Sequence, residues 1–96
     1  MCGISGEITW SGERPDLAAV AAMTETMTAR GPDGEGAYLH RNVALGHRRL
    51  EIIDLSGRGA QPMVDTALGL SLVFNGCIYN YRELRDELAG HGYSFF

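Results

Sequence analysis

The sequence predicts an α+β domain in which helices lie on antiparallel β-sheet. Two observations lead to this fold class. Short segments with alternating or continuous apolar residues, typical of strands, recur from the first residues to the last. Two segments with apolar residues at helical spacing separate them. Most of the 13 glycines lie between these segments, as expected for tight turns.

The first predicted element is a half-buried strand over residues 2–10. Its apolar side chains, from Cys2 to Trp10, fall on even positions, whereas Glu7 and Thr9 fall on odd positions. Because alternate side chains of a strand point to opposite faces, we expect the even face to be the covered one.

A helix is predicted to follow Asp16, whose carboxylate can accept hydrogen bonds from the free N–H groups of a first helical turn. The apolar side chains of this segment share one face, and the methionines among them are expected to fill the core. These residues are Leu17, Val20, Ala21, Met23 and Met27. Gly31-Pro32 is expected to end the helix, and residues 30–36 are predicted to form a polar loop.

A hairpin is predicted over residues 38–50, with its turn at Arg41-Asn42. The pattern extends the second strand through Ile53, and residues 59–63 are predicted to be an ordered connector. Residues 70–74 form a short, strongly apolar strand pattern. It stops at Asn75-Gly76, a dipeptide that readily adopts positive φ.

The last predicted elements are a helix and a strand. Asn80 followed three residues later by Glu83 is a capping pattern, and a helical stripe ends at Gly90. That stripe consists of Tyr81, Leu84 and Leu88. Residues 93–96 resume a strand pattern, and because the sequence stops inside it, we interpret the chain as part of a longer protein.

Composition argues against several classes of function. The net charge is −4 and no basic cluster is longer than His47-Arg48-Arg49, which argues against a nucleic-acid partner. No apolar run reaches the roughly 20 residues that span a bilayer and no export signal is recognisable, so we expect no membrane association and a cytoplasmic location. With three histidines and no CxxC motif, no metal site is expected, and Cys2 and Cys77 are expected to be thiols.

Cys2 is a candidate nucleophile. If Met1 is removed, the thiol and a free α-amine belong to one residue, and an α-amine with a pKa of roughly 7.7 to 8.0 can act as its base. The thiol, with a reference pKa of about 8.5, needs only a modest change of environment to become reactive. The alternative is an ordinary cysteine at the second position.

Four separated motifs support the catalytic interpretation. In order they are Cys2-Gly3-Ile4, Arg30-Gly31-Pro32-Asp33, Gly46-His47-Arg48-Arg49-Leu50 with Ile53-Asp54-Leu55, and Phe74-Asn75-Gly76 with Ile78-Tyr79-Asn80. Together they resemble the N-terminal glutaminase domain of the glutamine-hydrolysing asparagine synthase family, a class II glutamine amidotransferase. The resemblance implies an N-terminal nucleophile hydrolase fold, a four-layer αββα sandwich of antiparallel sheets. Residues 1–96 would be its N-terminal portion, without the synthetase domain.

The resemblance also implies roles for individual residues. The Cys2 thiolate would attack the side-chain amide of glutamine and release glutamate and ammonia through a thioester. Asn75 and Gly76 would hold the oxyanion, and Arg49 would bind the substrate α-carboxylate. The structural alternatives are a hairpin turn for Asn75-Gly76 and a surface side chain for Arg49. The resemblance further implies that the loop from Arg30 to Asp33 and the Gln61-Pro62 connector shape the pocket without a catalytic role. His47 is expected to be a packed strand residue rather than a base.

Cys77 departs from the family pattern. Most relatives have a glutamate there, which helps hold the substrate α-amine, and a neutral thiol cannot make that charge-assisted bond. Either other groups hold the ammonium of glutamine or binding is weaker. Apart from this role, Cys77 is expected to be a buried, inert cysteine rather than a second nucleophile. The run from Phe74 to Tyr79 is also similar to N-acetylglutaminylglutamine amidotransferases, which use the same glutaminase chemistry with a different ammonia acceptor.

The expected partners are glutamine and an ammonia acceptor bound by the absent synthetase domain. That domain would use ATP and magnesium to activate a carboxylate, and no cofactor is expected within residues 1–96. We expect the isolated 96-residue chain to have little or no glutaminase activity. Two alternatives remain: a non-catalytic module that self-associates as a homo-oligomer through its open sheet, and a fold that has lost its activity.

Overall fold

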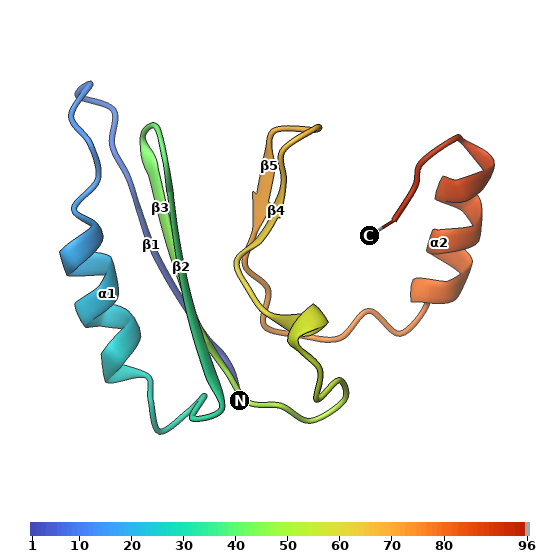
Figure 1. Cartoon of the computed structure of the whole chain (residues 1–96), viewed down its shortest axis with the longest axis horizontal. Coiled ribbons are helices and arrows are strands. Elements are labelled where there is room, and N and C mark those ends of the chain that lie inside the picture. Colours follow the sequence, from blue (N-terminus) through green and yellow to red (C-terminus); the bar gives the residue numbers. More distant parts are fainter. Residues whose placement is uncertain (96) are drawn as a thin grey trace.

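The computed structural model describes residues 1–95 and has a mixed α+β architecture with antiparallel sheets, as predicted. Figure 1 shows helix α1, a three-stranded sheet, a two-stranded ribbon and helix α2 following one another across the view. The elements are β1 (Gly3–Ile8), α1 (Leu17–Thr26), β2 (Gly34–His40), β3 (Val43–Arg49), a 3-10 turn (Gly57–Gly59), β4 (Met63–Asp65), β5 (Leu70–Leu72) and α2 (Tyr81–Gly90).

The larger sheet has the strand order β1-β3-β2, and both pairs are antiparallel. β3 is therefore the central strand, with Gly3 of β1 opposite Arg48 and Gly34 of β2 opposite Arg49. The β2–β3 hairpin turns at Arg41 and Asn42, and Arg41 has a φ of 53°. The predicted hairpin and its turn are confirmed.

The small core lies between α1 and one face of this sheet. Gly46 of β3 lets the helix approach closely, because a methyl group there would overlap the hydroxyl of Thr24. The hydroxyls of Ser5 and Thr24 are hydrogen-bonded at 2.8 Å across this contact. Val20 and Ala44 are fully buried beside it.

The face of β1 that was predicted to be covered is open among the described residues. Ile4 and Ile8 are 50% and 53% exposed, and Trp10 is 88% exposed. The predicted alternation is present, but the odd positions, with Gly3 and Ser5, are the ones that face α1. Small side chains suit that face because they let a helix pack closely, so the prediction assigned the wrong face to the core.

The start of α1 is as predicted, and its packing is as predicted only in part: Val20 is fully buried and Met27 packs against Gly3, but Leu17 and Met23 do not fill the core. The Asp16 carboxylate accepts the Ala19 N–H at 3.0 Å, which confirms the N-terminal cap. Thr24 is buried, whereas Leu17 and Met23 are 39% and 42% exposed. The polar hydroxyl replaces the predicted methionine in the core because it meets the backbone at Gly46, where no long side chain fits.

Three boundaries in the first half of the chain differ from the prediction. α1 ends at Thr26 rather than at Gly31-Pro32, and β2 begins at Gly34, inside the predicted loop. The second hairpin strand ends at Arg49 and does not continue to Ile53. It ends there because the Asp33 carboxylate accepts the N–H of Glu51 at 2.9 Å and turns the chain away.

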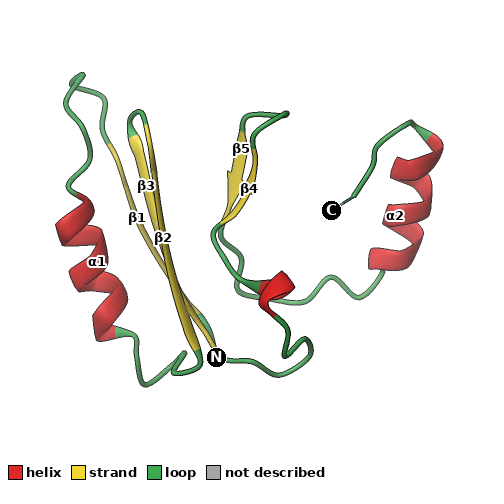
Figure 2. Cartoon of the chain, viewed as in Figure 1, coloured by secondary structure: helices red, strands yellow, loops and turns green. Residues whose placement is uncertain are grey.

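The second half of the chain contains the two-stranded ribbon, in which β4 and β5 pair antiparallel. β4 was missed, since three residues are too few to show alternation. The predicted strand over residues 70–74 is confirmed only for Leu70–Leu72, and both leucines are more than half exposed. Figure 2 shows that long loops connect the short elements of this half.

Helix α2 has the predicted bounds but stands apart. Asn80 is the N-cap residue, as predicted, and its carbonyl accepts the N–H of Leu84 in the first bond of the helix, but its side chain makes no capping hydrogen bond. Within the described chain α2 has no buried residue and does not pack closely on another helix or strand. Residues 93–95 form no strand, which corrects the prediction there, and Phe96 lies outside the described residues.

Among residues 1–95, no helix has the length and apolar character required to span a membrane.

Candidate functional site

One cavity of about 390 Å³ brings together every residue that the sequence predicted for the site. Cys2, Arg49, Asn75, Gly76 and Cys77 all line it, although they come from three distant parts of the chain. The remaining lining residues are Met1, Leu50, Ile52, Ile53, Asp54, Gln61 and Phe74. The fold therefore collects the predicted nucleophile, the predicted oxyanion donors and an arginine around one space.

Cys2 lies immediately before β1 and is partly buried. Its sulfur accepts the N–H of Leu50 at 3.3 Å, and the thiol lies 3.8 Å from the carbonyl oxygen of the same residue. The backbone just after β3 thus fixes the sulfur beside Arg49.

The chain start is fastened to the loop that follows α1. The amine of Met1 donates to the carbonyl oxygen of Arg30 at 3.1 Å. Arg48 holds the same loop, because its Nε donates to the carbonyl of Gly31 at 2.9 Å and its Nη1 pairs with Glu35 at 2.8 Å. Arg48, to which the sequence assigned no role, therefore anchors the loop to β3 and β2.

Arg49 is bound to the turn that follows β3. Its Nη1 donates to the carbonyl of Ser56 at 2.9 Å and lies 3.4 Å from a carboxylate oxygen of Glu51, while Nη2 donates to the carbonyl of Asp54. A guanidinium carries five N–H donors, so it can bind this turn and still offer a donor to an anion. The predicted binding of a substrate carboxylate stays a prediction.

His47 is buried on the same face of β3 as Arg49, with 1% of its surface exposed. Burial lowers the pKa of His47 below its ordinary value; a backbone hydrogen bond with Phe74 opposes this, and the charge of Arg49 adds to it. Its Nε2 has no hydrogen-bond partner among the described residues. The imidazole ring is packed on one face of the sheet, as expected for a structural strand residue.

Asn75 and Gly76 lie in a loop held at Phe74. The N–H of Phe74 donates to the side-chain oxygen of Gln61 at 2.5 Å. The Phe74 ring covers Gly76 so closely that a methyl group there would lie 2.8 Å from the ring. Sequence reasoning gave Gln61 no chemical role, and the only available signal was an amide in a short connector beside a proline.

Cys77 is an exposed free thiol, so the prediction that it is buried is wrong. The cavity is lined by both cysteines of the chain. Asp54 supplies the only side-chain carboxylate among the described residues that line the cavity. Hydrogen bonds from Ser56, first from its side chain and then from its backbone, lower the pKa of Asp54 below its ordinary value. The cavity therefore contains an anion beside the Arg49 cation.

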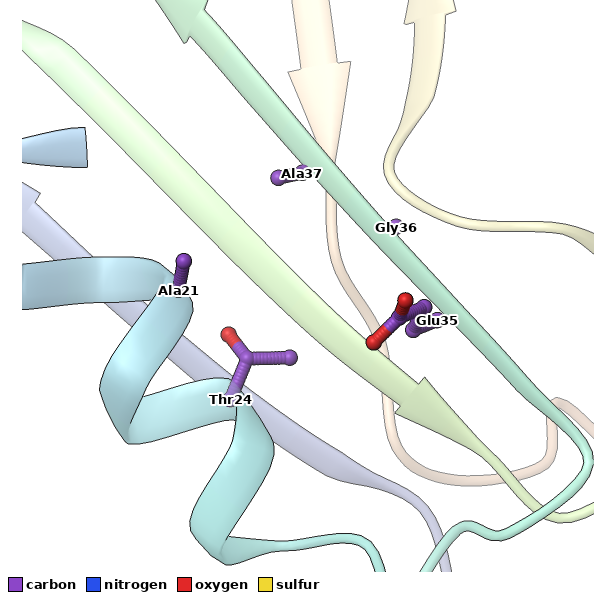
Figure 3. Close-up of a pocket in the computed structure, with 5 residues that line it drawn as sticks. All are labelled: Ala21, Thr24, Glu35, Gly36 and Ala37. Atoms are coloured by element: carbon purple, nitrogen blue, oxygen red, sulfur yellow. The ribbon is translucent and has the colours of Figure 1, made fainter. Parts of the chain in front are cut away.

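A second cavity, of about 330 Å³, lies on the opposite side of the sheet between α1 and β2 (Figure 3). Its lining consists of Ala21, Thr24, Glu35, Gly36 and Ala37. The Glu35 carboxylate is paired with Arg48, and no cysteine, histidine or lysine lines the space. This cavity lacks the groups for nucleophilic chemistry.

The described part of the chain contains no group of three or more His, Cys, Asp or Glu side chains that could hold a metal ion.

Comparison with known proteins points to one family. Residues 1–96 match the model of the glutamine amidotransferase domain. Two glutamine-hydrolyzing asparagine synthetases of Bacillus subtilis, numbers 3 and 1, are 36% and 37% identical to this sequence, each over 99% of the chain. Amidase chry2 of Gibberella zeae is 41% identical over 93% of the chain. The chain spans only 16%, 15% and 15% of the lengths of these three proteins.

Proposed function

Because this chain belongs to the glutamine amidotransferase domain family, we propose that it carries the nucleophile and oxyanion donors of a glutaminase site. One observation carries the proposal: Cys2, Arg49 and the Asn75-Gly76 pair line a single cavity. Hydrolysis of the side-chain amide of an amino acid needs a nucleophile, oxyanion donors and a group that binds the α-carboxylate. The thiol, the amide and backbone N–H donors, and the guanidinium can supply these three functions.

We propose that removal of Met1 leaves Cys2 with a free α-amine. The Cys2 sulfur forms a bond to the side-chain carbonyl carbon of glutamine, and the electron pair of the C=O bond moves to oxygen. When this oxyanion collapses, the C–N bond breaks and ammonia departs with a proton passed on by the α-amine. Water then cleaves the thioester, giving glutamate and the free thiol.

The oxyanion is held by the side-chain amide of Asn75 and the N–H of Gly76. Removing one donor of this kind typically costs about 10²- to 10³-fold in rate. Arg49 binds the α-carboxylate of glutamine with the guanidinium donors that the turn after β3 leaves available. At Cys77 a neutral thiol faces the site, so we expect the substrate ammonium to be held by other groups or bound weakly.

For the surrounding fold we propose the N-terminal nucleophile hydrolase architecture, with residues 1–96 as the N-terminal portion of the glutaminase domain. The order α1, three-stranded sheet, β4–β5 ribbon and α2 in Figure 1 supports an αββα layering. A further portion of the domain would cover the open faces of the sheet and of α2.

We further propose that the ammonia is transferred to an ATP-activated carboxylate. The names of the Bacillus subtilis relatives support asparagine synthesis as the reaction. ATP and its magnesium would be bound by a synthetase domain, which the resemblance to the asparagine synthase family implies. Asparagine formation from aspartate, measured with the full-length gene product, tests the acceptor.

The glutaminase proposal is tested with Cys2→Ala in the full-length gene product. We expect glutamate release to fall by at least about 10³-fold, because the nucleophile is lost, while free ammonia still supports product formation. Cys77→Ala is the comparison: it should change KM for glutamine without abolishing turnover. Continued glutamate release by Cys2→Ala would refute the proposal, as would full activity in an enzyme whose intact mass retains Met1.

A further inference from the structure

The segment that carries Asn75 and Gly76 has no regular secondary structure. β5 ends at Leu72, and α2 begins only at Tyr81. Backbone in strands and helices is fixed by repeated hydrogen bonds, whereas this loop needs individual contacts to hold one conformation. The residues that make those contacts decide where the two proposed donors point.

Phe74 is the residue through which this loop is held. Its N–H donates to the side-chain oxygen of Gln61 at 2.5 Å, and its ring lies against Gly76. Fixing Phe74 therefore fixes the direction in which the backbone enters Asn75 and the surface against which Gly76 rests.

Gln61 is itself fixed on the sheet. Gly36 of β2 lies directly beneath its backbone, where a methyl group would overlap the carbonyl oxygen of Gln61 and come within 3.1 Å of Pro62. This contact lies on the face of the sheet that also carries His47, since Gly36 and His47 are register partners. The amide of Gln61 thus connects the well-packed sheet with the loop.

We propose that Gln61 is a positioning residue, whose side-chain oxygen holds the Phe74 backbone and thereby aims the Asn75 amide and the Gly76 N–H at the reacting carbonyl. The inference rests on the proposed glutaminase function. Gln61 touches no reacting atom in this scheme. Its contribution is made through the loop, so its loss should lower the rate of the chemical step more than the binding of glutamine.

The test compares Gln61→Met with Gln61→Glu in the full-length gene product. Methionine has a similar length but cannot accept the N–H as an oxygen does, whereas glutamate keeps an acceptor oxygen. For Gln61→Met we expect kcat for glutamate release to fall by about 10- to 100-fold with little change in KM, because small misplacements of catalytic groups are costly. Gln61→Glu should recover most of the lost kcat.

Two further measurements separate positioning from loss of structure. Alkylation of Cys2 by iodoacetamide and product formation from free ammonia should be unchanged in both variants, because neither needs the oxyanion donors. Wild-type kcat in Gln61→Met would overturn the inference. So would an equal loss in Gln61→Glu, or a loss of kcat accompanied by slower alkylation of Cys2.

Cys2→Ala in the same series separates this inference from the function on which it rests. If Cys2→Ala abolishes glutamate release and Gln61→Met does not lower it, only the positioning role fails. If Cys2→Ala remains active, the glutaminase proposal fails regardless of the Gln61 variants.

Discussion

The two halves of the chain are built differently. In residues 1–50 a helix packs on a three-stranded sheet, and the fully buried Val20 and Ala44 lie in this half. In residues 51–95 the strands have three residues each, and α2 has no buried residue. The first half therefore has a core of its own, whereas the second half is held by separate contacts.

The proposed site lies across this division. Cys2 and Arg49 belong to the well-packed half, whereas Asn75 and Gly76 belong to the loosely packed half. Two sets of contacts cross the division: Arg49 donates to the carbonyls of residues 54 and 56, and Gly36 packs against the backbone of Gln61, whose side chain accepts the N–H of Phe74. Because an oxyanion site depends on exact placement of its donors, these connections should matter more for rate than for folding.

The largest effect is expected where the two halves meet at Gly36. In Gly36→Ala the new methyl group overlaps the Gln61 carbonyl, which is backbone and cannot rotate away. The connector must move off the sheet, and we expect glutamine-dependent turnover of the full-length gene product to fall by at least about 100-fold. Turnover with free ammonia should be retained.

Gly34→Ala is the matched control for this variant. Gly34 lies two residues earlier on the same face of β2, and a methyl group there would be 3.6 Å from the nearest atom, in Arg49. We expect glutamate release within about threefold of wild type, since this distance is an ordinary contact. Equal losses at Gly34 and Gly36 would contradict a specific connection through Gln61.

A smaller effect is expected at Gly46, inside the well-packed half. The methyl group of Gly46→Ala would overlap the Thr24 hydroxyl and lie 2.5 Å from that of Ser5. Overpacking of this kind typically costs about 1–3 kcal/mol, so amides in α1 and β3 should exchange hydrogen faster. Gly90→Ala in α2, where no atom lies within 4 Å, should instead stabilise its helix by up to about 1 kcal/mol. If both substitutions changed stability in the same direction, the proposed difference in packing between the two halves would be contradicted.

Truncation of apolar side chains tests the same difference without adding atoms. Val20→Ala removes methyl groups from a fully buried position and should destabilise the first half by about 1–2 kcal/mol. Leu88→Ala removes more atoms from a side chain that is 39% exposed, yet it should cost less than about 1 kcal/mol within this chain. Urea unfolding midpoints of the purified 96-residue chain measure both; a larger cost at Leu88 would show that α2 has a core after all.

The structure gathers the residues predicted for the site around one cavity, whereas it corrects the predicted burial of their surroundings. Turn and cap residues act locally, so the turn at Arg41-Asn42 and the Asp16 cap could be predicted from the neighbouring residues alone. α1 packs on the face of β1 that lies next to Gly46, because the missing side chain there lets the helix approach closely. The alternation of apolar residues does not predict this close approach.

Contacts between distant segments also could not be predicted from the sequence pattern. The motifs containing Cys2, Arg49 and Asn75 could be linked only through a family resemblance, and the structure then places all three around one cavity. The bond between Gln61 and Phe74 joins residues 13 apart across a connector and a hairpin, and no local pattern marks it. The short strand β4 was missed for the same reason, since pairing with β5 defines it.

The smallest expected effect is the pH dependence of the well-packed half, through His47. Burial lowers the pKa of His47 below its ordinary value of 6.5, so the unfolded chain binds this proton more readily than the folded one. The stabilisation is therefore fully present above pH 6.5 and is lost as the pH falls from there toward the lowered pKa, by less than about 1.4 kcal/mol per pH unit for one proton. Hydrogen exchange of β3 amides, corrected for the intrinsic effect of pH, should show faster opening at pH 5.5 than at pH 7.5. His47→Gln should reduce this difference because glutamine does not titrate; an unchanged pH dependence in that variant would assign the effect to other groups.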